Sequence, residues 1–111
     1  MNYKCISEIH FEESNHLGLL KKVIFGGSET SSSITQVAYS ELNADDVVNE
    51  HSHVSMEEVF LILDGICEFY LDGVVYILGK ESVIKVAPNT THMIKALTHT
   101  KIFYFGVAIA V

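Results

Sequence analysis

Three residues of the segment HSHVSMEEVF, residues 51–60, have side chains that together could bind a metal ion. His51 and His53 are two positions apart, and residues two apart in an extended strand share a face. By the same alternation, Glu58 shares a face with the apolar residues that need burial, while Glu57 faces the other way and is expected to be solvated. Two imidazoles and a carboxylate in an apolar interior are costly unless something compensates them. A divalent transition metal compensates all three, and imidazole and carboxylate are suitable ligands for it.

A fourth candidate ligand lies downstream, in the segment VAPNTTHMI, residues 86–94. A tight turn at Pro88 and Asn89 is expected to deliver His92 to the start of a new strand, where it shares a face with Ile94. One His-x-His pair among six histidines could arise by chance, and each histidine alone would be read as an ordinary residue. The two segments together favour a metal site made of His51, His53, Glu58 and His92.

The segments that must position these side chains are short, rich in β-branched and aromatic residues, and separated by turns. Asp72-Gly73 between two apolar runs is a strong signal for a two-residue hairpin. No segment shows convincing helical periodicity. The expected strands cover residues 33–40, 58–63, 67–71, 74–78, 83–86, 92–97 and 101–111. Regularly spaced short strands predict an all-β barrel or sandwich, and 111 residues suit a single domain, residues 1–111.

Two of the expected strands, residues 59–63 and 102–109, are apolar on both faces. In a small one-layer barrel one of those faces would be in water, so something is expected to cover it. Either an N-terminal segment around residues 23–25 does this, or a second copy of the chain does. We favour the second copy and therefore predict a homodimer.

The charge of the chain disfavours some classes of partner. Seven Lys+Arg against fourteen Asp+Glu give a net charge of −7, which disfavours nucleic acid and anionic membranes. Cys5 and Cys67 form no Cys-x-x-Cys unit and are expected to be free thiols in a reducing compartment. The N-terminus lacks the apolar core of a signal peptide, and the longest apolar run, residues 102–111, is too short to cross a bilayer. We expect a cytoplasmic protein.

The two metal-binding segments resemble the two sequence motifs of the cupin superfamily. HSHVSMEEVFLILDG is similar to the first motif, G(X)5HXH(X)3,4E(X)6G, with His51, His53, Glu58 and Gly65 on its histidines, glutamate and final glycine. APNTTH resembles the second motif, PXG(X)2H(X)3N, with His92 on its histidine. The resemblance covers roughly residues 49–96 and is closest to small single-domain cupins.

The chain departs from these motifs at positions that are not ligands. Ala87, Asn89 and Ala96 stand where the second motif has proline, glycine and asparagine, and Asp45 and Asp46 lie where the first opens with glycine. Asn89 can replace a glycine in a turn because asparagine tolerates a positive φ. The loss of the asparagine at position 96 removes a polar group near the second motif.

The resemblance implies a double-stranded β-helix of the cupin, jelly-roll-like type with a metal site of three histidines and one glutamate. The expected cofactor is a divalent transition metal: Fe, Mn, Ni or Zn. Four protein ligands leave two positions open on an octahedral ion, whereas on tetrahedral zinc they close the site. Small single-domain cupins include dioxygenases, isomerases and decarboxylases. We therefore expect a metal-dependent enzyme of oxygenase or isomerase type acting on a small molecule, with two alternatives: a non-catalytic metal-containing binding or sensor module, and a purely structural barrel.

Six further residues are candidates for the walls of the pocket: Gln36, Cys67, Tyr70, Tyr76, Lys95 and Tyr104. Gln36 faces the pocket if Ile34 and Ala38 face inward, and the opposite parity sends it to solvent. Cys67 is expected to be a small core residue, and Lys95 to face outward. The tyrosines are expected to pack with a wet hydroxyl, although one near the metal could donate a proton. Five residues are expected on the surface: His10, His16, His99 and the pair Lys21-Lys22.

Overall fold

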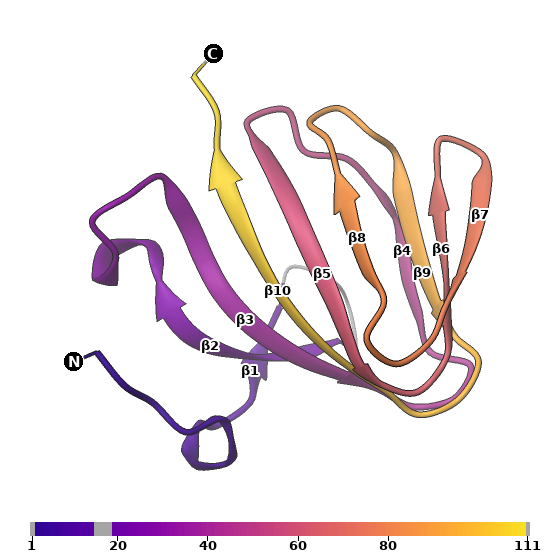
Figure 1. Ribbon diagram of the computed structural model, residues 1–111, viewed down its shortest axis with the longest axis horizontal. Coiled ribbons are helices and arrows are strands. Elements are labelled where there is room, and N and C mark those ends of the chain that lie inside the picture. The colour runs from indigo at the N-terminus through magenta and orange to yellow at the C-terminus, as the bar shows by residue number, and fades with distance from the viewer. Residues whose placement is uncertain (1, 15–18, 111) are drawn as a thin grey trace.

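The computed structural model of the protein describes residues 2–14 and 19–110, and shows a chain that is almost wholly β (Figure 1). Its only helical turns in those residues are two short 3-10 segments, η1 (Ile6–Glu8) and η2 (Gly27–Glu29). The strands are β1 (Glu12–Glu13), β2 (Leu20–Gly26), β3 (Ile34–Leu42), β4 (Val47–His51), β5 (Met56–Asp64), β6 (Cys67–Leu71), β7 (Val74–Leu78), β8 (Val83–Val86), β9 (His92–Ala96) and β10 (Thr100–Ala108). No helix among these residues is long and apolar enough to cross a membrane.

The strands form two antiparallel sheets. The larger sheet has the order β1-β2-β3-β10-β5-β8, and the smaller sheet has the order β4-β9-β6-β7. In Figure 1, β2 and β3 of the larger sheet lie at the left, and the smaller sheet lies at the right. Strand pairing is nested: β6 pairs with β7, β5 with β8, β4 with β9 and β3 with β10. This nesting of hairpin partners confirms the predicted double-stranded β-helix of the jelly-roll type.

The nesting starts at the hairpin between β6 and β7. Asp72 and Gly73 both have a positive φ, 45° and 82°, as the tight turns that match strand twist require. The predicted strands 67–71, 74–78 and 83–86 are confirmed at both ends. The last strand was predicted too long, because β10 ends at Ala108.

The core lies between the two sheets and follows strand alternation. On β5, Phe60 and Ile62 are buried, while Leu61 between them is only half-buried. Phe60 of the larger sheet meets Phe69 of the smaller sheet with ring centroids 5.2 Å apart, in an edge-to-face contact. Burying aromatic and aliphatic side chains of this size stabilises the fold by roughly 1.5–3 kcal/mol each.

Of the two possible covers of the outer face, the alternative, the N-terminal segment around residues 23–25, does not lie on it. Residues 23–25 belong to β2, which pairs edge to edge with β3 and so extends the larger sheet instead of covering β5 and β10. On the outer face of those two strands, Leu61 and Phe103 are paired in register and half-buried. The homodimer stays a prediction, as does the cytoplasmic location.

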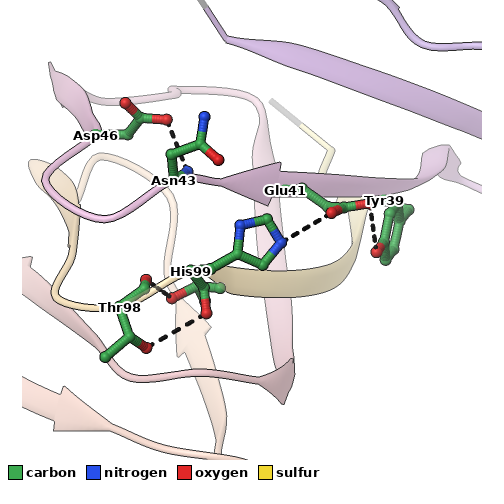
Figure 2. Close-up of polar contacts among 7 residues, drawn as sticks. Tyr39, Glu41, Asn43, Asp46, Thr98 and His99 are labelled. Carbon is green, nitrogen blue, oxygen red and sulfur yellow. Dashed lines mark hydrogen bonds and ion pairs between the residues drawn. The ribbon is translucent and has the colours of Figure 1, made fainter.

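A polar network occupies the outer side of β3 and fixes one predicted surface histidine (Figure 2). His99 Nε2 lies 2.9 Å from Glu41 Oε1, and the Tyr39 hydroxyl donates to Glu41 Oε2 at 3.0 Å. Burial acts to raise the pKa of Glu41, but the hydrogen bonds from Tyr39 and His99 outweigh it and the pKa is lowered. Burial and the neighbouring Glu41 carboxylate raise the pKa of Tyr39 to about 12. His99 and the exposed His10 thus lie on the surface as predicted, and His16 falls outside the described residues.

Cys67 is a core residue, as predicted, and its thiol should therefore react slowly in the native protein. Burial of the thiol raises the pKa of Cys67 to about 11. Since the thiolate is the reactive form, roughly one Cys67 thiol in a thousand is ionised at pH 8. We expect a disulfide reagent at pH 8 to label one thiol per native chain, the half-buried Cys5, and a second only after unfolding in guanidinium. A Cys5→Ser variant that is labelled as fast when native as when unfolded would contradict this burial.

Candidate metal centre

The structure brings the four candidate ligands together. His51, His53, Glu58 and His92 each offer one ligand atom, and these atoms all lie within 4.8 Å of one another. His51 is the last residue of β4 and is paired in register with His92, the first residue of β9. The ring centroids of His51 and His92 are 4.0 Å apart, and that of His53 is 5.0 Å from His51. Glu58 reaches the cluster from β5, so both sheets contribute.

The route by which His53 reaches the cluster differs from the prediction. Strand alternation was expected to align His51 and His53, but β4 ends at His51 and His53 lies in the loop before β5. The backbone carbonyl of His53 accepts a hydrogen bond from the Asn89 amide at 2.7 Å. Asn89 has φ 63°, the conformation that the sequence predicted for this turn. The loop carrying His53 and the turn leading to His92 therefore hold each other in place.

Two of the histidines are oriented by local backbone contacts. His51 Nδ1 lies 2.8 Å from the carbonyl oxygen of Asn49, and His92 Nδ1 lies 2.9 Å from that of Thr90. A carbonyl can only accept, so each Nδ1 carries the proton and Nε2 is the nitrogen with a lone pair for a metal. This is the usual supporting arrangement of metal-bound histidines.

Glu58 and His92 are buried without adequate partners. Glu58 is 6% exposed and His92 is 1% exposed. Glu58 Oε1 lies 3.4 Å from His53 Nε2 and 3.5 Å from His92 Nε2, which is too long for strong hydrogen bonds. Among the described residues, Glu58 Oε1 and His92 Nε2 have no hydrogen-bond partner. Leaving such atoms unpaired is costly, and a bound cation would satisfy both, so the residues present fit a metal ion.

In the metal-free protein, Glu58 also affects the protonation of His92. Burial acts to lower the pKa of His92, but the Glu58 carboxylate and the Thr90 carbonyl stabilise the imidazolium, and the pKa is raised. A proton and a metal therefore compete for the same nitrogen.

The cluster opens onto a pocket of about 100 Å³ between the sheets. Three of the four candidate ligands line it: His51, His53 and Glu58. Apolar side chains form much of its wall: Leu19, Leu42, Val48, Met56, Phe60, Ile94 and Ile102. The rest is Ser14 and four polar residues from β2, β3 and β10, which we call the polar wall: Lys21, Gln36, Ser40 and Tyr104.

The predicted pocket residues divide into two groups. Gln36 and Tyr104 line the pocket, so the inward parity of Gln36 is confirmed. The other four do not line it: Cys67 is in the core, the Tyr70 hydroxyl donates to Glu68 at 2.6 Å, Tyr76 is 45% exposed and Lys95 lies on β9 at an alternate position to His92. Glu57 is half-buried rather than fully solvated, and it does not line the pocket.

Lys21 was predicted to be exposed, and the structure corrects this. It lies on β2 opposite Ser40, so it shares the inward face of the sheet. Its neighbour Lys22 pairs with Tyr39 and faces the other way. Strand alternation in β2 could have shown that Lys21 and Lys22 point to opposite faces. Because both residues are lysines, the sequence shows no alternation of polar and apolar side chains at these two positions.

A family model described as cupin domain matches residues 38–107, more than half of the chain. The chain belongs to the cupin family. The match includes all four candidate ligands, and it confirms the resemblance in the two motifs.

Solved cupin-like structures share this fold over nearly the whole chain. A predicted oxalate decarboxylase from Thermotoga maritima has 20% identity and a TM-score of 0.87, covering 95% of this chain and 97% of that one. An RmlC-like cupin from Shewanella frigidimarina has 14% identity and a TM-score of 0.82, covering 98% and 92%. KdgF from Halomonas sp. has 16% identity and a TM-score of 0.80, covering 96% and 94%. At these identities the likeness shows the fold alone. A search among curated protein sequences finds no match.

Proposed function

We propose that this cupin binds a divalent transition metal through His51, His53, Glu58 and His92 and catalyses a reaction of a small metabolite in the adjoining pocket. The observation that carries the proposal is the convergence of four ligand atoms within 4.8 Å, two of them buried and unpaired. On an octahedral ion such as Fe²⁺, Mn²⁺ or Ni²⁺, the four protein ligands leave two positions for a substrate. When bound, the metal would polarise a substrate oxygen or activate dioxygen.

Tyr104 is the residue best placed to take part beyond the ligands. Its ring stacks on Phe60 with centroids 5.3 Å apart, and its hydroxyl is 3.0 Å from the Ser40 hydroxyl. Burial, aided by the charge of Glu58, raises the pKa of Tyr104 even though the Ser40 hydrogen bond acts to lower it. The phenol therefore stays protonated at neutral pH and can donate a hydrogen bond or a proton to a ligand in the pocket.

A second candidate function is a metal-containing module that binds a metabolite without converting it. The observation in its favour is that much of the pocket wall is apolar, with Tyr104 and Lys21 as its acid–base groups besides the ligands. The dioxygenase or isomerase assignment rests on the site's open positions and on the family, in which these activities occur.

The two functions separate in one experiment. Protein purified without added metal is analysed for its elements, then loaded with Fe²⁺, Mn²⁺ or Ni²⁺ and incubated with a panel of small metabolites. We expect stoichiometric metal and turnover that disappears in His92→Ala while the circular dichroism spectrum is kept. Metal and ligand binding without conversion would favour the binding module, and a folded protein that takes up no metal would overturn both.

A further inference from the structure

The polar wall holds a cation that has no carboxylate partner in the pocket. Lys21 Nζ donates to Gln36 Oε1 at 3.0 Å. Glu58 is the only carboxylate among the described residues that line the pocket, and it belongs to the metal centre. A neutral amide positions the ammonium but does not balance its charge, so the Lys21 ammonium can still pair with an anion.

Lys21 and Glu58 of the metal centre both lie on the larger sheet and line the same pocket. Gln36 of β3 is paired with Gly106 of β10, which is paired in turn with Glu58 of β5. At Gly106 a Cβ would lie 2.6 Å from Thr35 Oγ1 and 2.9 Å from Met56 Sδ, so these two side chains occupy the space beside the glycine. The two outer strands of this row are two strand spacings apart, roughly 10 Å.

The charge of the loaded pocket favours an anion. A divalent ion and Glu58 together carry one positive charge, and Lys21 adds a second. The chain as a whole has a net charge of −7, so this local excess of positive charge runs against its composition. In a largely apolar pocket these charges are screened less than at the surface, and they favour a ligand of opposite sign.

We propose that Lys21, held by Gln36, is a carboxylate anchor and that the pocket takes a small organic acid. One carboxylate of the ligand would pair with the Lys21 ammonium, and a second oxygen function would face the metal centre. This proposal rests on the metal site of the proposed function. One water molecule needs about 10–15 Å³ of cavity volume. The pocket of about 100 Å³ therefore holds roughly seven to ten water-sized groups, which suits a ligand of about seven to ten non-hydrogen atoms. Dicarboxylates and short hydroxy or oxo acids have that size, and nucleotides exceed it.

Lys22 gives a matched control on the adjacent position of β2. Lys22 Nζ donates to the Ile6 carbonyl at 2.9 Å and lies over the rings of Phe11 and Tyr39, on the face opposite to the pocket. The pair Lys21→Met and Lys22→Met removes the same charge from the same strand, once inside the pocket and once outside. Both variants keep a long apolar stem, so packing changes little.

The test is calorimetric titration of the cobalt(II)-loaded protein with malonate and succinate. Malonamide serves as the uncharged control for malonate. We expect at least one dicarboxylate to bind, and its dissociation constant to rise roughly 10- to 100-fold in Lys21→Met, the range for losing a hydrogen bond to a charged group. Lys21→Arg should keep most of the affinity, and Lys22→Met should match the wild type. Cobalt affinity should be the same in all four proteins.

Several results would overturn the anchor. They are unchanged dicarboxylate affinity in Lys21→Met, an equal loss in Lys22→Met, malonamide binding as tightly as malonate, or no binding of either dicarboxylate to the wild type. If the wild type takes up no cobalt, the metal proposal fails by itself and the titrations are made on the metal-free protein. Dicarboxylate binding that then depends on Lys21 would support the anchor alone, and its absence would refute it.

Discussion

Glu58→Gln is expected to lose the metal, whereas Glu57→Gln, its neighbour on β5, is expected to keep it. Glutamine has nearly the shape of glutamate but no negative charge, and a neutral amide is a much weaker ligand for a transition metal than a carboxylate. Loss of groups that merely orient a ligand typically costs 10- to 100-fold in metal affinity. Loss of the ligand charge itself should cost at least about 100-fold.

The two variants should also differ in the stability of the metal-free protein. Glu58 is 6% exposed, and its Oε1 has no hydrogen-bond partner in the described chain. At a pH above the raised pKa of His92, where its imidazole is neutral, removing the buried charge of Glu58 relieves a desolvation cost, so metal-free Glu58→Gln should be at least as stable as the wild type. If Glu58 were kept for structural reasons, Glu58→Gln would instead lower the stability of the metal-free protein. Lower affinity together with unchanged or higher stability is therefore the signature of a ligand.

Metal affinity is measured by competition with a chromophoric chelator, and stability by urea unfolding of the metal-free proteins. The assignment of Glu58 would be wrong if Glu58→Gln bound metal like the wild type. Loss of the metal in Glu57→Gln would also contradict the assignment, because Glu57 does not line the pocket and should have no role in binding the metal.

The sequence predicted the centre of the fold better than its periphery, for a physical reason. The hairpin of β6 and β7 is specified locally, by Asp72-Gly73 and the alternation on either side, and its bounds were predicted correctly. The strands β2 and β4 were not recognised as strands. β2 contains an irregular register between Val23 and Phe25, and β4 one between Val48 and His51, and such irregularities break the alternation that a sequence displays.

In the candidate site, too, the locally specified residues were predicted and those placed by long-range strand pairing were not. His51, His53, Glu58 and His92 were found because ligand spacing is carried by two short segments. Lys21 was missed because its place in the pocket depends on β2 lying beside β3 and β3 beside β10, an order of strands set by long-range pairing. The residues that could hold a metal were predictable from short sequence segments, and most of those that would select a substrate were not.

Gly65→Ala is expected to destabilise the protein severely, by roughly 2–5 kcal/mol, since two costs combine. Gly65 has φ 90°, a conformation that costs an L-residue about 1–2 kcal/mol. A Cβ there would also lie 2.1 Å from the His99 carbonyl oxygen and 2.7 Å from Thr100 Cα. These are backbone atoms and cannot swing aside, so the two turns would have to separate, an overpacking cost of about 1–3 kcal/mol.

Separating those turns would break a set of hydrogen bonds. The carbonyl of Ile66 accepts from the amides of Leu97 and Thr98 at 2.9 and 3.2 Å, and from the Thr100 hydroxyl at 3.2 Å. Thr100 is fully buried, so water cannot readily replace its partner. The glycine is thus required by the close approach of the two backbones.

Gly73→Ala is the matched control, because Gly73 has a similar φ of 82° but nothing within 4 Å of an added Cβ. It should cost only the conformational part, about 1–2 kcal/mol. Both variants are measured by urea unfolding, and equal costs would show that the contact with His99 and Thr100 contributes nothing. Gly65 lies seven residues along the chain from Glu58, roughly 23 Å in extended conformation. The folded fraction of Gly65→Ala should therefore bind metal like the wild type, which would make this motif glycine a determinant of the fold and not of the metal centre.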